Sequence, residues 1–531
     1  MTTNAASSKS NFDRVNHSSF ATDVLDDGDS AEIMRATLPN RAEQPKRKWK
    51  CTEISLETNG LIAPIDSMAE RKEFYDQRAT SRPAEAKRHY HRLLENYFQF
   101  LVPPGQCVLE LGCGLGDLIA SLKPARAVGV DFSANTIELA KPRNPSIEFH
   151  VADAAEFKSA EKFDYIVLSD LVNDVPDVQK VFEQARRNAT SDTRLVLNFF
   201  NQLWRPVLTV AQELGLKAPT QPQNWLSLGD VRNLLHLAGW EVIKSDVRIW
   251  WPVRTPLIER LLNRWVAPLL QHFCLTIFVV ARPRPEIAVD EHYSCSVVIP
   301  ARNEAGNIED AVKRVSEMGL GTEIIFIEGG SKDNTWDEIQ RVAKAYPHRN
   351  IKTMKQQSKG KGGAVREAFA AATGDILFIL DADLTMPPEE LPKFYEAARS
   401  GTADFVNGVR LVYPMEDQAM QFLNMIANKF FGIAFSWLLG QPIKDTLCGT
   451  KVLFRSQYEL IARNRDYFGD FDPFGDFDLL FGAAKLNLRI IDLPIRYRAR
   501  TYGETNISRW KHGWLLLRMT WFAARRLKFF A

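Results

Sequence analysis

Hydrophobic and polar positions follow no clear period until about residue 85. Residues 1–60 are rich in Ser, Asn and Asp and carry the basic run PKRKWK. A segment of this composition cannot bury enough apolar surface to fold, so we expect a disordered tail. From RHYHRLLENYFQFL onward, segments of helical period alternate with short apolar runs such as CVLEL, which are typical of strands.

The alternation of strands and helices runs through the chain twice. The first series ends at CLTIFVVARPRPE, where prolines mark a linker, and the second opens with CSVVIPARNEAGNIEDAVKRV. Repeated alternation of this kind predicts parallel sheets covered by helices. We therefore expect two α/β domains at 61–282 and 294–531, joined by a linker at 283–293.

Composition limits the compartment and the partners. A net charge of +2 gives no reason to expect nucleic-acid binding. No stretch of about 18 residues is apolar and uncharged, and the N-terminus lacks the apolar run of a signal peptide, so we expect no membrane span and no secretion. The cysteines form no CxxC pair, and we expect buried thiols in a reducing, cytoplasmic setting. They are Cys51, Cys107, Cys113, Cys274, Cys295 and Cys448.

The first series carries a glycine-rich turn followed by acids at strand ends. Gly112, Gly114 and Gly116 in VLELGCGLG would let the backbone approach a ligand closely at a helix N-terminus. Glu110 ends the first predicted strand, and Asp131 ends the second, where a carboxylate can accept hydrogen bonds from a ribose diol. Two further acids, Asp153 and Asp170, follow the third and fourth strands.

At these motifs, residues 71–282 resemble the class I S-adenosylmethionine-dependent methyltransferases, which have a Rossmann-like fold. The resemblance implies that the three glycines line the methionine moiety, that Asp131 holds the ribose and that Asp153 lies near the adenine. It also adds Glu110 and Asp170 to the cofactor site. A nicotinamide-binding domain is the alternative, but that family usually has GxGxxG spacing where this chain has GxGxG.

The methyl acceptor is not apparent from the sequence. Methyl transfer to a hydroxyl needs a base, and Asp170, Asp174 and His150 are candidates that could equally be structural or solvated groups. The segment WWPVRTPLIERLLNRWVAPLLQHF is rich in Trp, Arg and Leu and fits either an interfacial helix or a helix that packs between domains. This first domain could also be a binding module without activity.

In the second series, the buried strand in FILDADLT ends on Asp381 and Asp383. Buried carboxylates are costly unless they are paired or hold a metal. Such a pair can hold Mg²⁺ or Mn²⁺ through its hard oxygen atoms, and two solvated turn aspartates are the alternative.

The motifs VVIPARNE, GKGGAVREAF, LDAD, DTLCGTKVLFR, GDFDLLF and RARTYGETNISRW resemble the family 2 glycosyltransferases of GT-A fold, in particular dolichol-phosphate mannosyltransferase and its polyprenyl-phosphate relatives. The resemblance implies a metal at Asp381 and Asp383 and a nucleotide-sugar donor. It places the donor among Pro300, Arg302, Glu304, Glu328, Lys361, Arg366 and Asp381. Arg410 and Arg500 match arginines near the acceptor phosphate. This chain departs from the family at Gly329, where an aspartate is usual, and at Asn506, where a lysine is usual; Arg509 or Lys511 could supply the missing contact.

The acceptor could be a lipid phosphate or a hydroxyl. A phosphate is already anionic and needs cations to position it, whereas a hydroxyl of a glycan or glycolipid needs a base, for which GDFDLLF offers Asp476. Two segments favour a lipid. QFLNMIANKFFGIAFSWLLG predicts a helix with an apolar face including Phe430 and a polar stripe including Asn428, half-sunk in a bilayer or packed internally.

The second such segment is SRWKHGWLLLRMTWFAARRLKFFA, which combines basic residues with three tryptophans and contains no acid. This combination fits an anionic membrane surface, although a nucleic-acid patch would have the same ingredients. We therefore predict a bifunctional enzyme on the inner face of the cytoplasmic membrane. It would transfer a sugar to a polyprenyl phosphate and methylate a related substrate.

Overall fold

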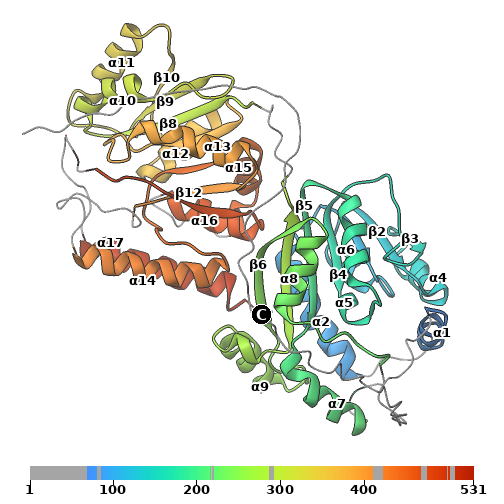
Figure 1. The fold of residues 1–531 in the computed structure, drawn as a ribbon. Helices are drawn as coiled ribbons and strands as arrows, with labels where there is room; N and C mark the ends of the chain where they lie inside the picture. The colour runs from blue at the N-terminus through green and yellow to red at the C-terminus, as the bar shows by residue number, and fades with distance from the viewer. Residues whose placement is uncertain are drawn as a thin grey trace, which may run out of the picture. The chain divides into compact units, whose positions relative to one another are not determined.

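The computed structural model describes residues 68–79, 85–215, 217, 220–285, 292–410, 422–467, 475–498, 500, 502 and 509–530. The predicted tail, Cys51 and Asn506 lie outside the described residues. Residues Ile65–Ala531 form one compact unit. This unit contains two seven-stranded sheets, each flanked by helices (Figure 1).

The first sheet has the strand order β3-β2-β1-β4-β5-β7-β6. Its strands are β1 (Cys107–Leu111), β2 (Arg126–Asp131), β3 (Glu148–Val151), β4 (Phe163–Ser169), β5 (Ala189–Phe200), β6 (Trp240–Arg248) and β7 (Thr276–Pro283). The strands β1 to β5 pair in parallel, as predicted. The prediction of a fully parallel sheet was wrong at β7, which runs antiparallel to both β5 and β6. The reason is that β6 and β7 are adjacent strands whose connection, made of short helices between residues 256 and 273, returns the chain from the same end of the sheet. A parallel pair would need a crossover to the opposite end.

Helices cover both faces of this sheet. The helices in this part of the chain are α1 (Met68–Ala79), α2 (Glu85–Leu101), α3 (Asp117–Ser121), α4 (Ala134–Arg143), α5 (Leu171–Asp174), α6 (Val178–Arg187), α7 (Arg205–Glu213), α8 (Leu228–Leu237) and α9 (Pro256–Leu261), with the short turns η1 (Gln202–Trp204), η2 (Leu262–Val266) and η3 (Gln271–Phe273). Apolar side chains of α6 and α8 fill the core on one face, and those of α2, α3 and α4 fill the other. Caps fix where the helices begin: Asp177 accepts a hydrogen bond from the Lys180 N–H, and Ser227 forms a capping box with Asp230.

The second sheet has the order β10-β9-β8-β11-β13-β12-β14. Its strands are β8 (Cys295–Ala301), β9 (Thr322–Glu328), β10 (Asn350–Lys355), β11 (Ile376–Ile379), β12 (Phe405–Val409), β13 (Lys451–Phe454) and β14 (Ile490–Pro494). Here β13 is the antiparallel strand, between β11 and β12. The strands β9 and β11 each pair in parallel with β8, so the carboxyl ends of these three strands meet at one edge of the sheet.

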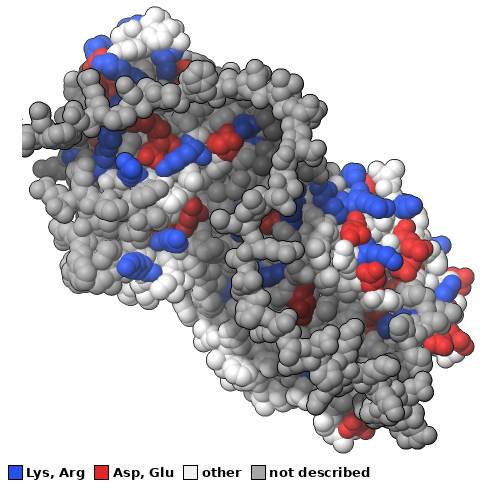
Figure 2. Space-filling model, in the orientation of Figure 1, with Lys and Arg blue, Asp and Glu red and all other residues white. Residues whose placement is uncertain are grey.

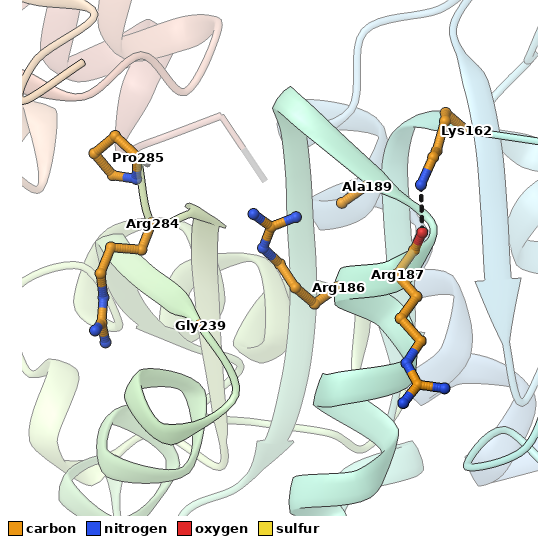
Figure 3. Close-up of a pocket in the computed structure, with 7 residues that line it drawn as sticks. All are labelled: Lys162, Arg186, Arg187, Ala189, Gly239, Arg284 and Pro285. Carbon is orange, nitrogen blue, oxygen red and sulfur yellow. Dashed lines mark hydrogen bonds between the residues drawn. The ribbon is translucent and has the colours of Figure 1, made fainter. Parts of the chain in front are cut away.

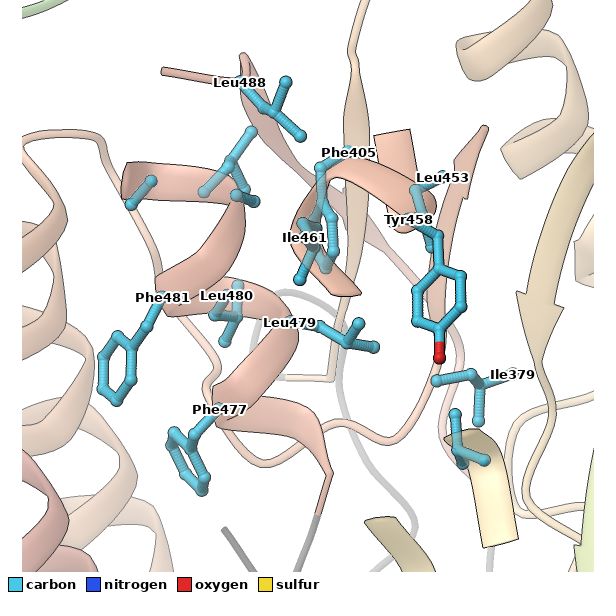
Figure 4. Packing of buried hydrophobic residues seen from close by; sticks show 14 of the residues in the cluster. Ile379, Phe405, Leu453, Tyr458, Ile461, Phe477, Leu479, Leu480, Phe481 and Leu488 are labelled. Atoms are coloured by element: carbon cyan, nitrogen blue, oxygen red, sulfur yellow. The ribbon is translucent and has the colours of Figure 1, made fainter. Parts of the chain in front are cut away.

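This sheet too is covered on both faces. Its helices are α10 (Ile308–Arg314), α11 (Thr335–Ala345), α12 (Gly360–Ala371), α13 (Leu391–Arg399), α14 (Phe422–Leu439), α15 (Arg455–Arg463), α16 (Asp476–Lys485) and α17 (Arg509–Leu527), with the short turns η4 (Ala305–Asn307), η5 (Pro388–Glu390) and η6 (Arg465–Tyr467). The helices α10, α11 and α13 pack on one face, and α12 and α14 to α17 pack on the other. Figure 4 shows this second core, to which α16 contributes Phe477, Leu480 and Phe481.

The helix α14 forms where the sequence predicts it, but with different faces. Asn428, assigned to the polar stripe, is only 4% exposed, whereas Phe430 is 56% and Ile433 is 74% exposed. Phe431, Phe435 and Leu438 instead point into the core beside α17. The prediction of an outward polar stripe was therefore wrong, because the core selects the more continuous row of large apolar side chains. Among the described helices, none is long and apolar enough to cross a membrane.

A buried ion network joins the two sheets. The Arg194 and Arg282 guanidinium groups, from β5 and β7, donate to the two carboxylate oxygens of Asp404 at 2.6 and 2.9 Å. Arg194 also donates to the Asn487 carbonyl at 2.9 Å, and the Arg489 N–H donates to Asp404. Both arginines are almost fully buried, so this shared carboxylate offsets much of the cost of burying their charges. Arg282 has a second partner in Glu241, at 3.0 Å.

We expect Asp404→Ala to lower the free energy of unfolding by about 3–5 kcal/mol, because it leaves two buried arginines without their common partner. Urea titration would measure the loss. Glu396→Ala, which removes an exposed partner of Arg399, is the matched control and should change little. Equal stability of the two variants would contradict the prediction.

Candidate functional sites

The glycine-rich loop after β1 forms the first candidate site. All three glycines have positive φ, at +74° for Gly112, +52° for Gly114 and +78° for Gly116. A Cβ at Gly112 would lie 2.7 Å from Leu171 and one at Gly116 would lie 2.7 Å from Phe149, so these two are needed for packing. A Cβ at Gly114 would meet no atom within 4 Å. Of the three glycines, Gly114 is thus the one with open space at its Cβ position.

Asp131 lies beside that open position at the end of β2. Its carboxylate accepts hydrogen bonds from the Gly114 and Ser133 N–H groups, each at 3.0 Å. Burial raises the pKa of Asp131, and these two donors oppose the rise. The oxygens retain lone pairs that can accept from the hydroxyls of a ribose. Asp153 follows β3 and accepts from the Ala155 N–H at 2.9 Å.

Glu110 lies below the loop. It is 2% exposed, and its Oε2 accepts a hydrogen bond from the Ile119 N–H of α3 at 3.1 Å. Burial raises its pKa well above the usual carboxyl range. The hydrogen bond from Ile119 ties the start of α3, which follows the loop, to the end of β1. Contact of Glu110 with the cofactor stays a prediction.

Asp170 has a network that the sequence did not reveal. Its Oδ1 accepts from the Asn198 amide at 2.6 Å and from the Tyr90 hydroxyl at 3.2 Å. Tyr90 comes from α2 and also contacts Thr276 of β7 at 3.1 Å. Asp170 has φ +55°, an uncommon conformation that often marks functional positions. Only the position of Asp170 at a strand end hinted at this network.

The other two base candidates lie in different surroundings. Asp174 accepts from the Tyr75 hydroxyl of α1 at 2.8 Å and from the Gln223 amide at 3.1 Å. The His150 Nε2 is 2.8 Å from Glu148 on the edge strand β3. The structure therefore brings Asp174 toward α1, whereas His150 forms a local surface pair.

We expect Gly114→Ala to weaken S-adenosylmethionine binding at least about tenfold, because the added methyl group fills the open space beside Asp131. Gly105→Ala is a matched control: Gly105 also has positive φ, at +77°, and open surroundings, but it precedes β1. Both variants place an alanine at positive φ, so comparing them by calorimetric titration separates backbone strain from loss of the site. Equal affinities would contradict the prediction.

The second candidate site lies where β11 ends. The Lys361 ammonium, from the first turn of α12, is 2.6 Å from Oδ1 of Asp381. Burial acts to raise the pKa of Asp381, but the charge and hydrogen bond of Lys361, together with the charges of Lys451 and Arg410, outweigh burial and the pKa is lowered. A Cβ at Gly449 would lie 2.1 Å from Asp381 Oδ2 and 2.6 Å from Lys361 Nζ. Gly449, from the DTLCGTK motif, thus closes one side of this pair.

The second aspartate has its own cation. Arg500 donates to Asp383 Oδ2 at 2.6 Å and to Glu304 Oε1 at 3.1 Å. Asp383 also accepts from the Thr385 hydroxyl at 2.8 Å and from its N–H. Burial raises the pKa of Glu304, against the effect of Arg500. The structure thus unites three predicted site residues, Glu304, Asp383 and Arg500, from the segments that follow β8, β11 and β14.

The remaining donor residues surround the same edge of the sheet. Pro300 lies in β8, and Arg302 is exposed just beyond it. Glu328 is buried at the end of β9 and accepts from the Ser331 N–H. Arg366, on α12, is half-buried near Tyr458.

Arg410 is held by a partner that the sequence did not indicate. Its guanidinium donates to both oxygens of Asp445, at 2.7 and 2.9 Å. Asp445 raises the pKa of Arg410 against the effect of burial. Arg410 also lies over the Tyr497 ring, at 5.2 Å. Binding of a phosphate to Arg410 stays a prediction.

Asp476 is the first residue of α16, and its side chain lies outside the described part of the structure. The residue before it, Gly475, packs closely against α12, because a Cβ at Gly475 would lie 2.5 Å from the Gly362 Cα. The start of α16 is therefore adjacent to the turn that carries Lys361.

The two carboxylates of Asp381 and Asp383 fit a divalent cation in their chemistry, since Mg²⁺ and Mn²⁺ prefer oxygen ligands. No group of three or more His, Cys, Asp and Glu side chains that could hold a metal ion occurs among the described residues. The other ligands would have to come from substrate or water. Figure 2 shows acidic side chains flanked by basic ones on the surface near α12.

A separate cavity of about 500 Å³ lies at the opposite edge of the first sheet from Asp131. It is lined by Lys162, Arg186, Arg187, Ala189, Gly239, Arg284 and Pro285 (Figure 3). Lys162 donates to the Arg187 carbonyl, and Arg284 donates to the His236 carbonyl at 2.7 Å. None of the predicted site residues lines it.

Two separate segments of the chain match known protein families. Residues 80–245 match the family model of a methyltransferase domain, and residues 296–464 match that of glycosyl transferase family 2. The dolichol-phosphate mannosyltransferase of Pyrococcus furiosus is 30% identical over 220 residues, which are 40% of this chain and 59% of that protein.

Two further similarities were found. The undecaprenyl-phosphate 4-deoxy-4-formamido-L-arabinose transferase of Edwardsiella ictaluri is 26% identical over 214 residues, covering 40% of this chain and 62% of that protein. A solved SAM-dependent methyltransferase from Thermotoga maritima is 17% identical with a TM-score of 0.29, covering 36% of this chain and 90% of that one. The chain thus spans about three fifths of the length of the two curated relatives.

The predicted fold class and the two predicted transferase families agree with these matches. Residues 80–245 match a methyltransferase domain, and residues 296–464, which follow in the chain, match glycosyl transferase family 2.

Proposed function

We propose that the glycosyltransferase domain transfers a sugar from a nucleotide-sugar to a polyprenyl phosphate, with Mg²⁺ or Mn²⁺ held by Asp381 and Asp383. The observation that carries the proposal is the placement of Lys361 and Arg500 against these aspartates. The names of the two curated relatives, which include dolichol phosphate and undecaprenyl phosphate, support the acceptor class.

The chain's own residues have distinct tasks in this reaction. Lys361 and Arg500 exchange their carboxylate partners for phosphate oxygens of the substrates, since both are charge-assisted donors. Glu304 and Gly449 keep the two cations in place. A divalent cation would neutralise the charge that develops on the departing nucleotide diphosphate. The acceptor phosphate is already a nucleophile and needs no base.

We propose that the methyltransferase domain binds S-adenosylmethionine at Gly114 and Asp131 and methylates a related substrate. The hydrogen bond that the Gly114 N–H donates to the Asp131 carboxylate supports this, because it holds the carboxylate next to a glycine whose Cβ position is open. If the domain were only a binding module, S-adenosylmethionine would bind without being consumed in the presence of the glycosylated lipid.

The proposal is tested with purified full-length protein, undecaprenyl phosphate in detergent, Mn²⁺ and a panel of nucleotide-sugars. Mass spectrometry should find a lipid product heavier by one sugar with one donor. Addition of S-adenosylmethionine should then add one methyl group. Nucleotide release without a lipid product would overturn the phosphate acceptor.

A hydroxyl acceptor is the second candidate, because the start of α16 with Asp476 lies against the turn of Lys361. The variant Asp476→Asn separates the two routes. We expect turnover within about tenfold of wild type, because an anionic phosphate needs no general base. A loss of about a thousandfold, measured with saturating donor, would favour the hydroxyl route. Asp310→Asn, on the exposed side of α10, is the control.

A further inference from the structure

The methyltransferase domain exposes a row of large apolar side chains that its own core does not use. On η1 and α7 these are Leu203, Val207, Val210 and Leu214; on α9 and the segments beside it they are Val253, Leu257, Ile258, Leu261, Leu269, Leu270 and Phe273. Leu257 alone is 86% exposed. We name these residues the apolar face, and we propose that it docks the methyltransferase domain onto an anionic lipid bilayer.

The spacing of these side chains places them on common helix faces. Val207, Val210 and Leu214 are three and four residues apart, and Leu257 and Ile258 lie one turn before Leu261. The two groups are joined directly, because the Trp204 indole N–H donates to the Phe273 carbonyl at 2.8 Å. The segments that carry the two groups are therefore in contact, and a cluster of exposed large apolar side chains of this kind often marks an interaction site.

The charges around the face fit an anionic surface. Glu259 is the only acid between residues 250 and 273, and it turns inward to His89, at 3.2 Å. Arg254 and Arg260 are exposed in the same segment, and Arg205 is exposed on α7 with Glu213 at its far end. Arginines beside apolar side chains favour binding to acidic headgroups, at about 1 kcal/mol for each cation near the surface.

The face continues onto the glycosyltransferase domain. The Trp265 ring, on η2, stacks near Trp521 of α17 with centroids 6.3 Å apart. The Trp437 indole N–H of α14 donates to the Pro268 carbonyl at 3.2 Å. Beyond these contacts, α14 and α17 expose Phe430, Ile433, Trp514, Leu517 and Trp521. Tryptophans at the border of an apolar patch are typical of residues that sit at headgroup level.

A bilayer also fits the chemistry of the acceptor, and here the inference rests on the proposed function. A polyprenyl phosphate and its glycosylated product stay in the membrane, so a methyltransferase domain acting on that product needs access to the same surface. Because Arg194 and Arg282 tie this domain to Asp404, one docking event would present both domains to the lipid.

The test is flotation of the full chain with vesicles of phosphatidylcholine, with and without phosphatidylglycerol. We expect wild type to float, and more strongly with phosphatidylglycerol. The variant L257N/I258N/L261N should bind vesicles at least about tenfold less, since three apolar side chains no longer enter the interface. The matched control, V151N/L237N/L320N, changes three exposed apolar residues elsewhere and should float like wild type.

Sugar transfer to detergent-dissolved undecaprenyl phosphate, measured on the same proteins, separates this inference from the proposed function. The L257N/I258N/L261N variant should keep wild-type transfer in detergent. Transfer by a wild type that does not float would overturn the docking alone, and flotation without transfer would overturn the proposed function alone. Equal flotation of both variants would also overturn the docking. So would light scattering that shows a wild-type dimer which the L257N/I258N/L261N substitutions convert to monomers.

Discussion

The variant Asp381→Asn is expected to lose sugar transfer by about a thousandfold, which corresponds to about 4 kcal/mol of transition-state stabilisation. Asparagine keeps the shape of the side chain but removes the charge that holds Lys361 at 2.6 Å. The same charge would bind the divalent cation that neutralises the leaving diphosphate, a contribution of several kcal/mol. Initial rates with saturating nucleotide-sugar would measure the effect.

Two controls make this result specific. Asp310→Asn removes one charge from an exposed position on α10 of the same domain and should leave transfer unchanged. S-adenosylmethionine binding to Asp381→Asn should equal that of wild type, because the cofactor loop lies on the other sheet. Transfer within about tenfold of wild type would show that Asp381 does not act in the reaction.

The second large effect is expected from Gly449→Ala. The added methyl group would lie 2.1 Å from Asp381 Oδ2 and 2.6 Å from Lys361 Nζ, so both side chains must move. A displacement of about 1 Å at a reacting centre can cost about a hundredfold in rate, and we expect a loss of that size. The fold should persist, because the clash is with side-chain ends and not with backbone.

Gly513→Ala is the matched substitution. Gly513 lies on α17, and a Cβ at this position would meet no atom within 4 Å. Alanine is also a better helix former than glycine. This variant should keep full transfer, with equal or higher thermal stability. If Gly449→Ala and Gly513→Ala transferred sugar equally well, the close fit around Asp381 would have no catalytic importance.

The sequence was sufficient where a local motif determines the backbone. GxGxG after an apolar run predicted a turn between a strand and a helix, which the structure has between β1 and α3, and Asp131 and Asp381 lie at the carboxyl edges of their sheets as expected. These features follow from short-range rules, because parallel strands bring their carboxyl ends together. Four of the five described cysteines are also buried thiols, as predicted.

The sequence was insufficient where residues far apart in the chain compete for one partner. Arg410 matched a phosphate-binding position, but no local pattern shows that Asp445 occupies its guanidinium. Likewise, Tyr90 reaches Asp170 across 80 residues. The face of α14 was misjudged for the same reason: periodicity identifies a helix, but the neighbouring helices decide which side is buried.

The contact of Arg194 and Arg282 with Asp404 has a consequence for dissection of the enzyme. We expect that cutting the chain within 283–293 would not release two independently stable halves, because each fragment would expose charged groups that are buried in the intact chain. The N-terminal fragment would present Arg194 and Arg282 without Asp404, although Arg282 would keep Glu241. Its counterpart would present the Asp404 carboxylate with only the Arg489 N–H as a donor among the bonds described above. We therefore expect activity from separately produced halves only if the halves reassociate.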